Sequence, residues 1–363
     1  MTADDQMVGI AFIGTGFARR VQMPAFQMAG GCRIVSIASA AIENAEAAAK
    51  EFGSDHFTDD WREAVDHPHV DLVCITTPPI QHTEQVLYTA SRGKHILCEK
   101  PMAMNAGEAE RMCQAVRDAN ILALIDHELR FQTGRQRAKA MLRAGDIGKV
   151  RHVKYSFRNA MRGDASVPWN WWSDENSGGG TLGAIGSHAI DSLFWFLDTD
   201  ISSLSCQLQT HVKNRSDKSG VIRAVTTDDE SLLTFRFADS ELTDDATGTM
   251  SLSMIEYPDY EHTIEFVGTD GSIRVLYRGE VQIARAGDGS WTDVDVTIGE
   301  SIPGIFDSGF PSAFVAFAPK MIEALRKGGT TVENAATFDD GLRVQRILDL
   351  ARGSDRAGCA VRP

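Results

Sequence analysis

The first 130 residues alternate between short apolar runs and helical patterns, and this alternation constrains the fold more than any other feature. The runs VGIAFIG (8–14), CRIVSIAS (32–39) and VDLVCITTP (70–78) are typical of strands buried on both faces. Amphipathic segments lie between them, for example IENAEAAAKEFG (42–53). Strand alternating with helix predicts βαβ units around a parallel sheet. We therefore expect an α/β protein whose first domain, residues 1–128, is a doubly wound parallel sheet.

The pattern changes after about residue 130. Between 201 and 285, short runs such as ESLLTFRF (230–237) and GSIRVLY (271–277) alternate apolar and polar residues, with turn residues between them. Such alternation is typical of antiparallel strands with one exposed face. Two helical segments, SAFVAFAPKMIEALRKGG and FDDGLRVQRILDLARGS, follow near the end. We assign residues 129–363 to a second α/β domain with an open, mostly antiparallel sheet.

Composition narrows the class of partner. The net charge of −14 argues against general binding to nucleic acid, whose partners are strongly basic. No apolar run approaches the roughly 20 residues that span a bilayer. The six cysteines are scattered without CxxC spacing, which favours a reducing compartment. MTADDQM lacks the features of a signal peptide. We expect a cytoplasmic protein that binds a small molecule, and neither nucleic acid nor a membrane.

The segment AFIGTGFARR (11–20) places two glycines between the first strand and the first helix. Gly14 allows a tight turn, and Gly16, without a Cβ atom, lets the backbone approach a pyrophosphate at the helix N-terminus. The predicted cofactor turn is completed by Thr15, Phe17, Ala18 and Arg19. The alternative is an ordinary glycine-rich turn.

Two departures from the dinucleotide pattern bear on the cofactor. Arg19 occupies the third small position, so it must point outward or the helix must begin differently. The second strand ends at Ser39, without the acidic residue that binds the ribose 2′-hydroxyl. Ser39 with Arg19 or Arg20 would then accept a 2′-phosphate, which favours NADP over NAD. The alternative is that Ser39 accepts either cofactor.

Two further strand ends point to the same crevice, because ligands of doubly wound sheets lie at the carboxyl ends of strands. Thr76, Thr77 and Pro78 end one strand, and His82 follows as a cofactor neighbour or as a polar residue that opens a helix. HILCEKP (95–101) ends in a lysine whose ammonium would stabilise a substrate oxygen. The proline after Lys100 favours a fixed turn.

The stretch GGGTLGAIGSHAID (178–191) holds a single histidine. The glycines at 178–180 allow close backbone packing near a ligand. His188 is a candidate acid/base, since its ordinary pKa lies near working pH. The alternative is a core histidine satisfied by a neighbour. Asp191, three residues on, is the candidate that orients the ring, or else a helix-face residue.

An aromatic and basic stretch, FRNAMRGDASVPWNWWSDENS (157–177), leads into the glycines. Arg158, Arg162, Trp169 and Trp172 suit binding of a sugar ring or an anion. An aromatic plug between domains is the alternative. Asp126, His127 and Glu128 lack convincing metal-ligand spacing, and we predict no metal.

These segments resemble the Gfo/Idh/MocA oxidoreductases. The resemblance rests on GTGFARRVQMPAF, TTPPIQHTEQVLYTASRGKHILCEKPMAMN, GGGTLGAIGSHAIDSLFWFL and ATFDDGLRVQRILD, which together run through most of the chain. It implies an N-terminal Rossmann domain and a C-terminal α/β domain whose open sheet forms homodimers or homotetramers. It also implies hydride exchange between a secondary alcohol, often of a sugar or cyclitol, and nicotinamide.

The resemblance also assigns roles to residues. Gly14 and Gly16 would hold the pyrophosphate, Thr76–Pro78 would line the nicotinamide, and Glu99 would lie near its ribose. Lys100 would bind the reacting oxygen and His188 would act as general acid/base. The sequence departs from the family at Ala184, where an aspartate usually precedes the histidine.

We therefore expect an NAD(P)-dependent dehydrogenase of a polyhydroxylated substrate, with NADP favoured. One alternative is an enzyme that retains its cofactor for redox-assisted elimination. Another is a nucleotide-binding regulator without turnover, which Ala184 makes credible. Retention of both Lys100 and His188 favours an enzyme.

Overall fold

The computed structural model describes residues 7–363. The chain divides into two compact units, the first comprising the chain up to Phe131 together with Gly299–Leu342. The second comprises Gln132–Ile298 and Arg343–Pro363. The return of Gly299–Leu342 to the first unit is not signalled by the sequence pattern. It occurs because Phe314 and Phe317 of this segment bury their rings against Phe26 and Phe131.

The first unit is built on a doubly wound sheet. Within residues 7–363 this sheet has seven strands in the order β17-β6-β5-β4-β1-β2-β3, all parallel except β17. Their bounds are β1 (Val8–Ile13), β2 (Cys32–Ala38), β3 (Phe57–Thr58), β4 (Leu72–Ile75), β5 (His95–Cys98), β6 (Ala123–Ile125) and β17 (Ala336–Thr337). The central strands are fully buried, as continuous apolar runs predict.

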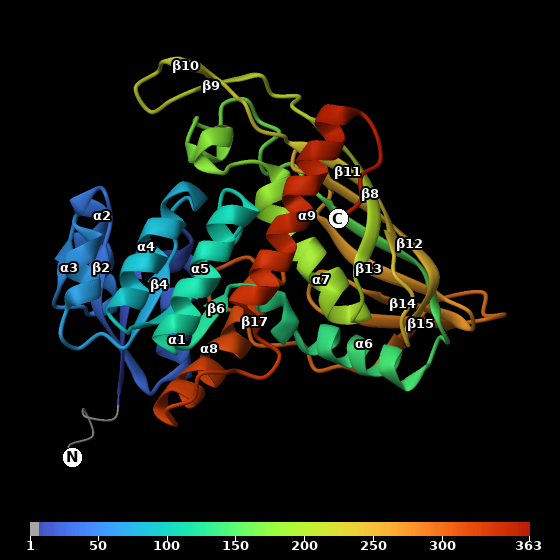
Figure 1. Ribbon diagram of the computed structural model, residues 1–363, viewed down its shortest axis with the longest axis horizontal. Helices are drawn as coiled ribbons and strands as arrows, with labels where there is room; N and C mark the ends of the chain where they lie inside the picture. Colours follow the sequence, from blue (N-terminus) through green and yellow to red (C-terminus); the bar gives the residue numbers. More distant parts are fainter. Residues whose placement is uncertain (1–6) are drawn as a thin grey trace. The chain divides into compact units, whose positions relative to one another are not determined.

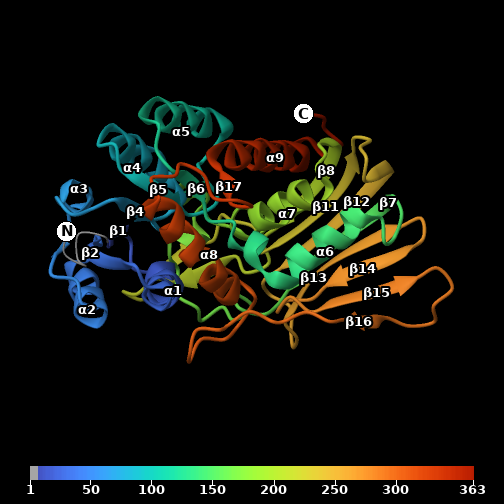
Figure 2. The same ribbon diagram turned by 90° about the horizontal axis from the view of Figure 1, so that it is seen from below.

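Helices cover both faces of this sheet, and each face has its own apolar core (Figure 2). One core is closed by α1 (Met23–Ala29), α2 (Ile42–Phe52) and α8 (Phe310–Arg326). The other is closed by α3 (Trp61–Asp66), α4 (Pro79–Ser91) and α5 (Ala106–Ala119). A short turn, η3 (Glu128–Phe131), ends the first stretch of the unit.

The second unit is built on a mostly antiparallel sheet. In the described chain it has eight strands in the order β16-β15-β14-β13-β7-β12-β11-β8, and β7 with β12 is its parallel pair. Their bounds are β7 (Val150–Arg158), β8 (Ile201–Gln209), β11 (Glu230–Phe237), β12 (Thr243–Ser253), β13 (Glu261–Gly268), β14 (Gly271–Val275), β15 (Val281–Arg285) and β16 (Thr292–Val294). The predicted fold class, a Rossmann sheet plus an α/β domain with an open antiparallel sheet, is confirmed.

Helices pack on one face of this second sheet (Figure 2). They are α6 (Thr133–Ala144), the π-helical turn η6 (Leu182–Gly186) and α7 (Ser187–Leu197); Phe196 of α7 contacts Phe266 of β13. A separate ribbon, β9 (Asn214–Ser216) with β10 (Ile222–Ala224), leaves the sheet (Figure 1). Short turns η4 (Trp171–Ser173) and η5 (Glu175–Ser177) precede the glycines. Helix α9 (Phe338–Ala357) begins in the first unit.

Among residues 7–363, no helix has both the length and the apolar character needed to cross a membrane.

Candidate active site

Strands β1 and β4 lie side by side at the centre of the first sheet. The winding reverses between them, because β2 and β3 lie beyond β1 while β5 and β6 lie beyond β4. Ligands of doubly wound sheets bind at this switch point, outside the carboxyl ends of the strands. The glycine turn follows β1 and Thr76–Pro78 follow β4, so two of the predicted cofactor segments adjoin the switch point.

The glycine turn has the geometry that a dinucleotide requires. Gly14 has φ +101°, and a Cβ atom there would lie 2.7 Å from Thr76 O and from Thr76 Oγ1. Gly16 is exposed, and a Cβ atom there would meet no protein atom within 4 Å. Gly14 is thus required by the turn, whereas the space in front of Gly16 is open to a ligand. Both features fit a pyrophosphate against the backbone.

The helix after the turn begins with a π-helical turn, η2 (Ala18–Gln22), which continues into α1. Ala18 is fully buried, while Arg19 points outward and its Nε donates to Glu51 Oε2 at 2.6 Å. Glu51 lies near the end of α2, whereas Ser39 precedes that helix, and Ile42 to Glu51 spans roughly 14 Å along its axis. Arg19 is thus paired with Glu51 in this structure, and a 2′-phosphate site formed by Ser39 with Arg19 or Arg20 stays a prediction.

His82 joins the two loops that follow β4 and β5. Its Nε2 lies 2.8 Å from Thr77 O, and its Nδ1 lies 3.2 Å from Pro101 O and from Met102 O. The side chain is fully buried, and burial lowers the pKa of His82 although these hydrogen bonds act in the opposite direction. His82 is thus a structural link between the loops.

Glu99 and Lys100 follow β5, and a cis peptide bond joins Lys100 to Pro101. Glu99 Oε2 lies 3.9 Å from Lys100 Nζ and accepts from Lys100 N at 3.3 Å. Burial raises the pKa of Glu99, and the charge of Lys100 opposes this. The Glu99 carboxylate is therefore a close counter-ion of Lys100.

Two buried partners of Glu99 escaped the sequence analysis. Gln22 Nε2 donates to Glu99 Oε1 at 3.0 Å and to Asp126 Oδ2 at 2.7 Å. Gln22 and Asp126 are both fully buried. The position of Gln22 between the apolar Val21 and Met23 was the available signal, since a polar group that is buried needs partners. Asp126 had been considered only as a metal ligand.

In the second unit, His188 and Asp191 lie in α7, and Ala184 lies in the preceding turn η6. All three are at most 3% exposed. Ser192 Oγ donates to His188 O at 2.7 Å and accepts from Arg135 Nη1 at 2.9 Å. The helical turn that carries His188 is thus held by side chains of its own unit. An orienting role for Asp191 stays a prediction.

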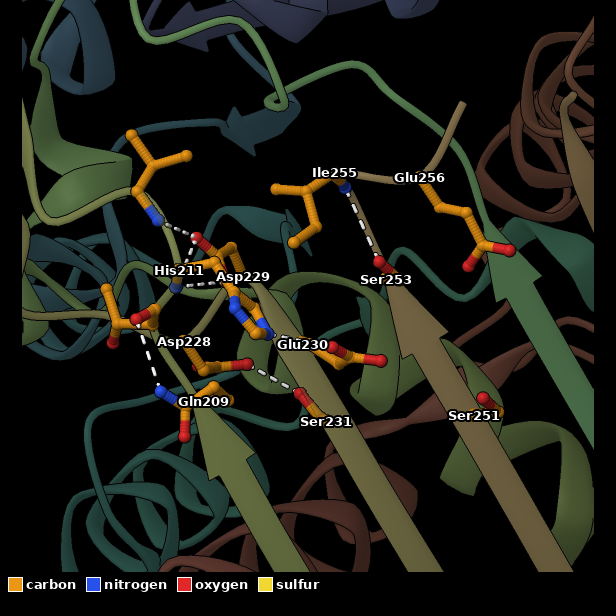
Figure 3. A network of polar contacts seen from close by, with 12 residues as sticks. Gln209, His211, Asp228, Asp229, Glu230, Ser231, Ser251, Ser253, Ile255 and Glu256 are labelled. Carbon is orange, nitrogen blue, oxygen red and sulfur yellow. Dashed lines mark hydrogen bonds and ion pairs between the residues drawn. The ribbon is translucent and has the colours of Figure 1, made fainter. Parts of the chain in front are cut away.

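Asp228 anchors the start of the helix that carries His188. Its Oδ2 accepts from Leu182 N at 2.7 Å. It also accepts from Ser231 Oγ at 2.6 Å (Figure 3). Gly180 has φ +105°, and a Cβ atom there would lie 2.3 Å from Asp228 Oδ1. A Cβ atom on Gly179 would lie 2.2 Å from Trp172 O. The glycines therefore allow close packing on Asp228 and on the tryptophan loop, a reason that sequence analysis did not find.

Arg162 and Trp172 are brought together beside these glycines. The Arg162 guanidinium lies 5.5 Å from the Trp172 ring centre, and its Nη2 donates to Ser173 Oγ at 3.0 Å. Burial, with the nearby charge of Arg215, lowers the pKa of Arg162 to about 10. This half-buried cation is suited to bind hydroxyl or anionic oxygens.

Arg158 and Trp169 have other partners in the unit. Arg158 is held by Glu256, by Glu230 at 3.1 Å and by Ser251, which are labelled in Figure 3. Along β7 it alternates with buried Phe157, so it lies on the sheet face opposite the core. Trp169 Nε1 donates to Ala224 O at 3.0 Å in the β9–β10 ribbon. Both side chains thus bind other parts of the second unit, and their predicted role in substrate binding stays a prediction.

Within residues 7–363, no group of three or more His, Cys, Asp or Glu side chains could hold a metal ion.

Comparisons with known proteins agree with this arrangement. Residues 8–127 match the oxidoreductase family with an NAD-binding Rossmann fold, and residues 135–274 match the GFO/IDH/MocA C-terminal domain. Levoglucosan dehydrogenase from Pseudarthrobacter phenanthrenivorans is 29% identical over 380 residues, covering 95% of each chain. Glucose-fructose oxidoreductase domain-containing protein 2 from Xenopus laevis is 28% identical and covers 96% of this chain and 92% of its own.

Solved structures show the same fold. Levoglucosan dehydrogenase in complex with NADH and levoglucosan superposes with a TM-score of 0.85 at 28% identity, over 98% of this chain and 99% of its own. An oxidoreductase domain protein from Kribbella flavida gives a TM-score of 0.86 at 25% identity, with the same coverage. The chain belongs to the Gfo/Idh/MocA family of NAD-binding oxidoreductases.

Proposed function

We propose that this protein is an NAD-dependent dehydrogenase that oxidises a secondary alcohol of a sugar or anhydrosugar. The observation that carries the proposal is the strand-end crevice of the first unit, where an open Gly16 follows β1 and Lys100 follows β5. Support for the substrate class comes from relatives whose structures hold NADH with levoglucosan or with L-sorbose.

The glycine turn, Gly14 to Ala18, holds the pyrophosphate, and the loops at Thr76–Pro78 and Glu99 border the nicotinamide. When bound, the dinucleotide supplies the hydride acceptor. Lys100 donates a hydrogen bond to the reacting oxygen and stabilises negative charge as it develops there. His188 accepts the hydroxyl proton as a general base, and Asp191 orients its ring.

NAD is proposed over NADP, contrary to the sequence-based preference. Arg19 is engaged by Glu51 near the end of α2, away from Ser39, so it adds no positive charge where a 2′-phosphate would lie. Ser39 is proposed to accept the 2′-hydroxyl of NAD. Activity with NADPH above that with NADH would contradict this choice.

Substrate binding in the second unit is assigned to Arg162 and Trp172. The Trp172 ring provides a flat apolar surface for the sugar's C–H face, and the Arg162 guanidinium, which bonds to a hydroxyl in the structure, provides donors for sugar oxygens. Arg158 is not included, because Glu230 and Glu256 already neutralise it.

We also propose that the protein forms a homodimer or homotetramer through the exposed face of the second sheet. That face carries the exposed Leu232 of β11 and paired charges such as Lys154 with Glu265, at 2.8 Å. Light scattering in solution tests the assembly, and a monomer at all concentrations would refute it.

A cytoplasmic location is proposed because all six cysteines are free.

The function is tested by following NAD⁺ reduction with a panel of sugars, cyclitols and anhydrosugars, levoglucosan among them. We expect turnover with at least one, lost by about 100-fold or more in Lys100→Met and in His188→Ala. Matched controls are Lys327→Met and His69→Ala, which remove an exposed lysine and an exposed histidine. Tight cofactor binding without turnover on any substrate would instead support the regulator hypothesis.

A further inference from the structure

Three buried polar side chains meet where β5 and β6 end. Glu99 comes directly after β5, Asp126 comes directly after β6, and Gln22 reaches them from the first helix. Asp126 and Gln22 are fully buried and Glu99 is 7% exposed. A buried charge without a partner costs free energy, so the stability of this cluster depends on which of its carboxyl groups are protonated.

The contact between the two carboxyl groups requires a proton. A side-chain hydrogen bond joins Asp126 to Glu99, and two carboxyl groups can form one only if one of them is protonated. The Gln22 amide donates to both groups and therefore fixes their separation. Glu99 then directs its other oxygen, Oε2, toward Lys100.

Two observations favour Asp126 over Glu99 as the group that carries this proton. Burial, followed by the charges of Glu128 and Glu99, raises the pKa of Asp126 well above its usual value. Asp126 Oδ1 is buried with no hydrogen-bond partner among the described residues, so an ionised Asp126 would leave an uncompensated charge. For Glu99, burial is opposed by Lys100 and by the bond from Asp126, both of which favour its anion.

We propose that Asp126 is a positioning residue for Lys100, acting as a neutral carboxylic acid that donates to Glu99 and keeps Glu99 anionic against the lysine ammonium. Asp126 touches neither substrate nor cofactor in this scheme. Its effect on turnover rests on the proposed role of Lys100, whereas its protonation does not. Other titratable groups face the pair: Lys100, Glu128 and the buried thiols Cys74 and Cys98.

Two substitutions of Asp126 distinguish a positioning role for its proton from a role in packing alone. Asp126→Asn keeps a neutral donor of the same shape, so we expect kcat/KM within about twofold of wild type at every pH. Asp126→Ala removes the donor, so Glu99 becomes easier to protonate. We expect its kcat/KM to fall at least about tenfold near neutral pH, and the acidic limb of its pH profile to move up by about one pH unit.

The outcomes that overturn the proposal are distinct from these. If the role of Asp126 were purely structural, Asp126→Ala would lower kcat/KM by the same factor at every pH, and the acidic limb of the pH profile would not move. An ionised Asp126 would make Asp126→Asn as damaging as Asp126→Ala. Thermal unfolding and binding of NADH, followed by its fluorescence, identify a variant that fails to fold.

Infrared spectroscopy tests the protonation without any turnover. We expect the wild-type protein at neutral pH to show the carbonyl stretch of a protonated carboxyl group, and Asp126→Asn to lose it. Retention of this band in Asp126→Asn, or its absence from the wild type, would refute the shared proton. Loss of the band as expected, in a protein that oxidises no sugar, would leave the shared proton standing and reject the proposed function instead.

Discussion

The two units place different charged groups beside their candidate site residues. The first places carboxyl groups at its strand ends, and burial raises the pKa of Glu99 and of Asp126. The second buries arginines, and burial lowers the pKa of Arg162 to about 10 and that of Arg215 as well. The Arg215 Nη atoms donate to backbone carbonyls, such as Asp164 O at 2.7 Å. The first unit thus gathers carboxyl groups beside Lys100, and the second gathers arginines beside the tryptophan loop.

The largest effect is expected in the glycine turn of the first unit. Gly14→Ala introduces a Cβ atom at positive φ against Thr76, and should destabilise the fold by about 3 kcal/mol and abolish cofactor binding. Gly16→Ala should leave the melting temperature unchanged and weaken NADH binding at least about tenfold, because its Cβ atom meets only ligand. Equal effects of the two on stability would contradict a cofactor-facing Gly16.

The corresponding support in the second unit is Asp228. Asp228→Ala removes the acceptor for Leu182 N and Ser231 Oγ, and should cost about 2 kcal/mol of unfolding free energy. Because the helix of His188 begins there, kcat/KM should also fall about tenfold while NADH affinity is kept. Calorimetry and cofactor titration measure both. A loss of NADH affinity would show that Asp228 does not act within the second unit alone.

Arg158, at the end of β7, and Arg162, in the loop that follows, are expected to differ in their effect on substrate binding. Arg162→Met should raise the substrate KM about tenfold, because a half-buried cation is lost from beside Trp172. Arg158→Met is the matched control and should change the KM by less than about twofold, since Glu230 and Glu256 already pair with Arg158 on the face opposite the core. Steady-state kinetics measures the substrate KM of both variants. A larger increase in KM for Arg158→Met than for Arg162→Met would support Arg158 as a substrate-binding residue.

A pH test follows from the acids of the first unit. Asp126 binds its proton more tightly in the folded state than in the unfolded state, so its contribution to stability is present at low pH and declines as pH rises above its unfolded value. Asp126→Asn removes this dependence. Its melting temperature at pH 8 should equal or exceed that of the wild type. The difference in melting temperature between Asp126→Asn and wild type should therefore not become less favourable to the variant from pH 5 to pH 8. A variant that loses stability relative to wild type over this range would contradict the raised pKa of Asp126.

The smallest effect is expected for Arg19→Ala. Because Arg19 pairs with Glu51, we expect the ratio of kcat/KM for NADH and NADPH to change by less than about twofold. A selective loss of activity with NADPH would restore the 2′-phosphate role that the sequence suggested.

The sequence predicted the first unit better than the second. Parallel strands end on one edge, so Gly14, Thr76 and Lys100 could be assigned to one crevice from their order alone. In the second unit, neighbouring residues of a strand face opposite sides. Arg158 ends β7 on the face opposite the core, whereas Arg162 lies in the following loop, so their different surroundings depend on where the strand ends.

Long-range contacts account for what the sequence could not reveal. The bonds from Gln22 to Asp126 and from Asp228 to Leu182 join residues 104 and 46 positions apart. The return of Gly299–Leu342 to the first unit likewise depends on aromatic packing across the chain. Helical and strand periodicity carry no information about such pairings.

The central claim is that hydride passes from a sugar carbon to NAD. The direct measurement is mass spectrometry of NADH formed from NAD⁺ and a sugar deuterated at the carbon that bears the oxidised hydroxyl. The account predicts deuterium in the reduced cofactor, and no such product from the Lys100→Met variant. NADH without deuterium, or no reduction by any sugar in a protein that binds NAD⁺, would contradict it.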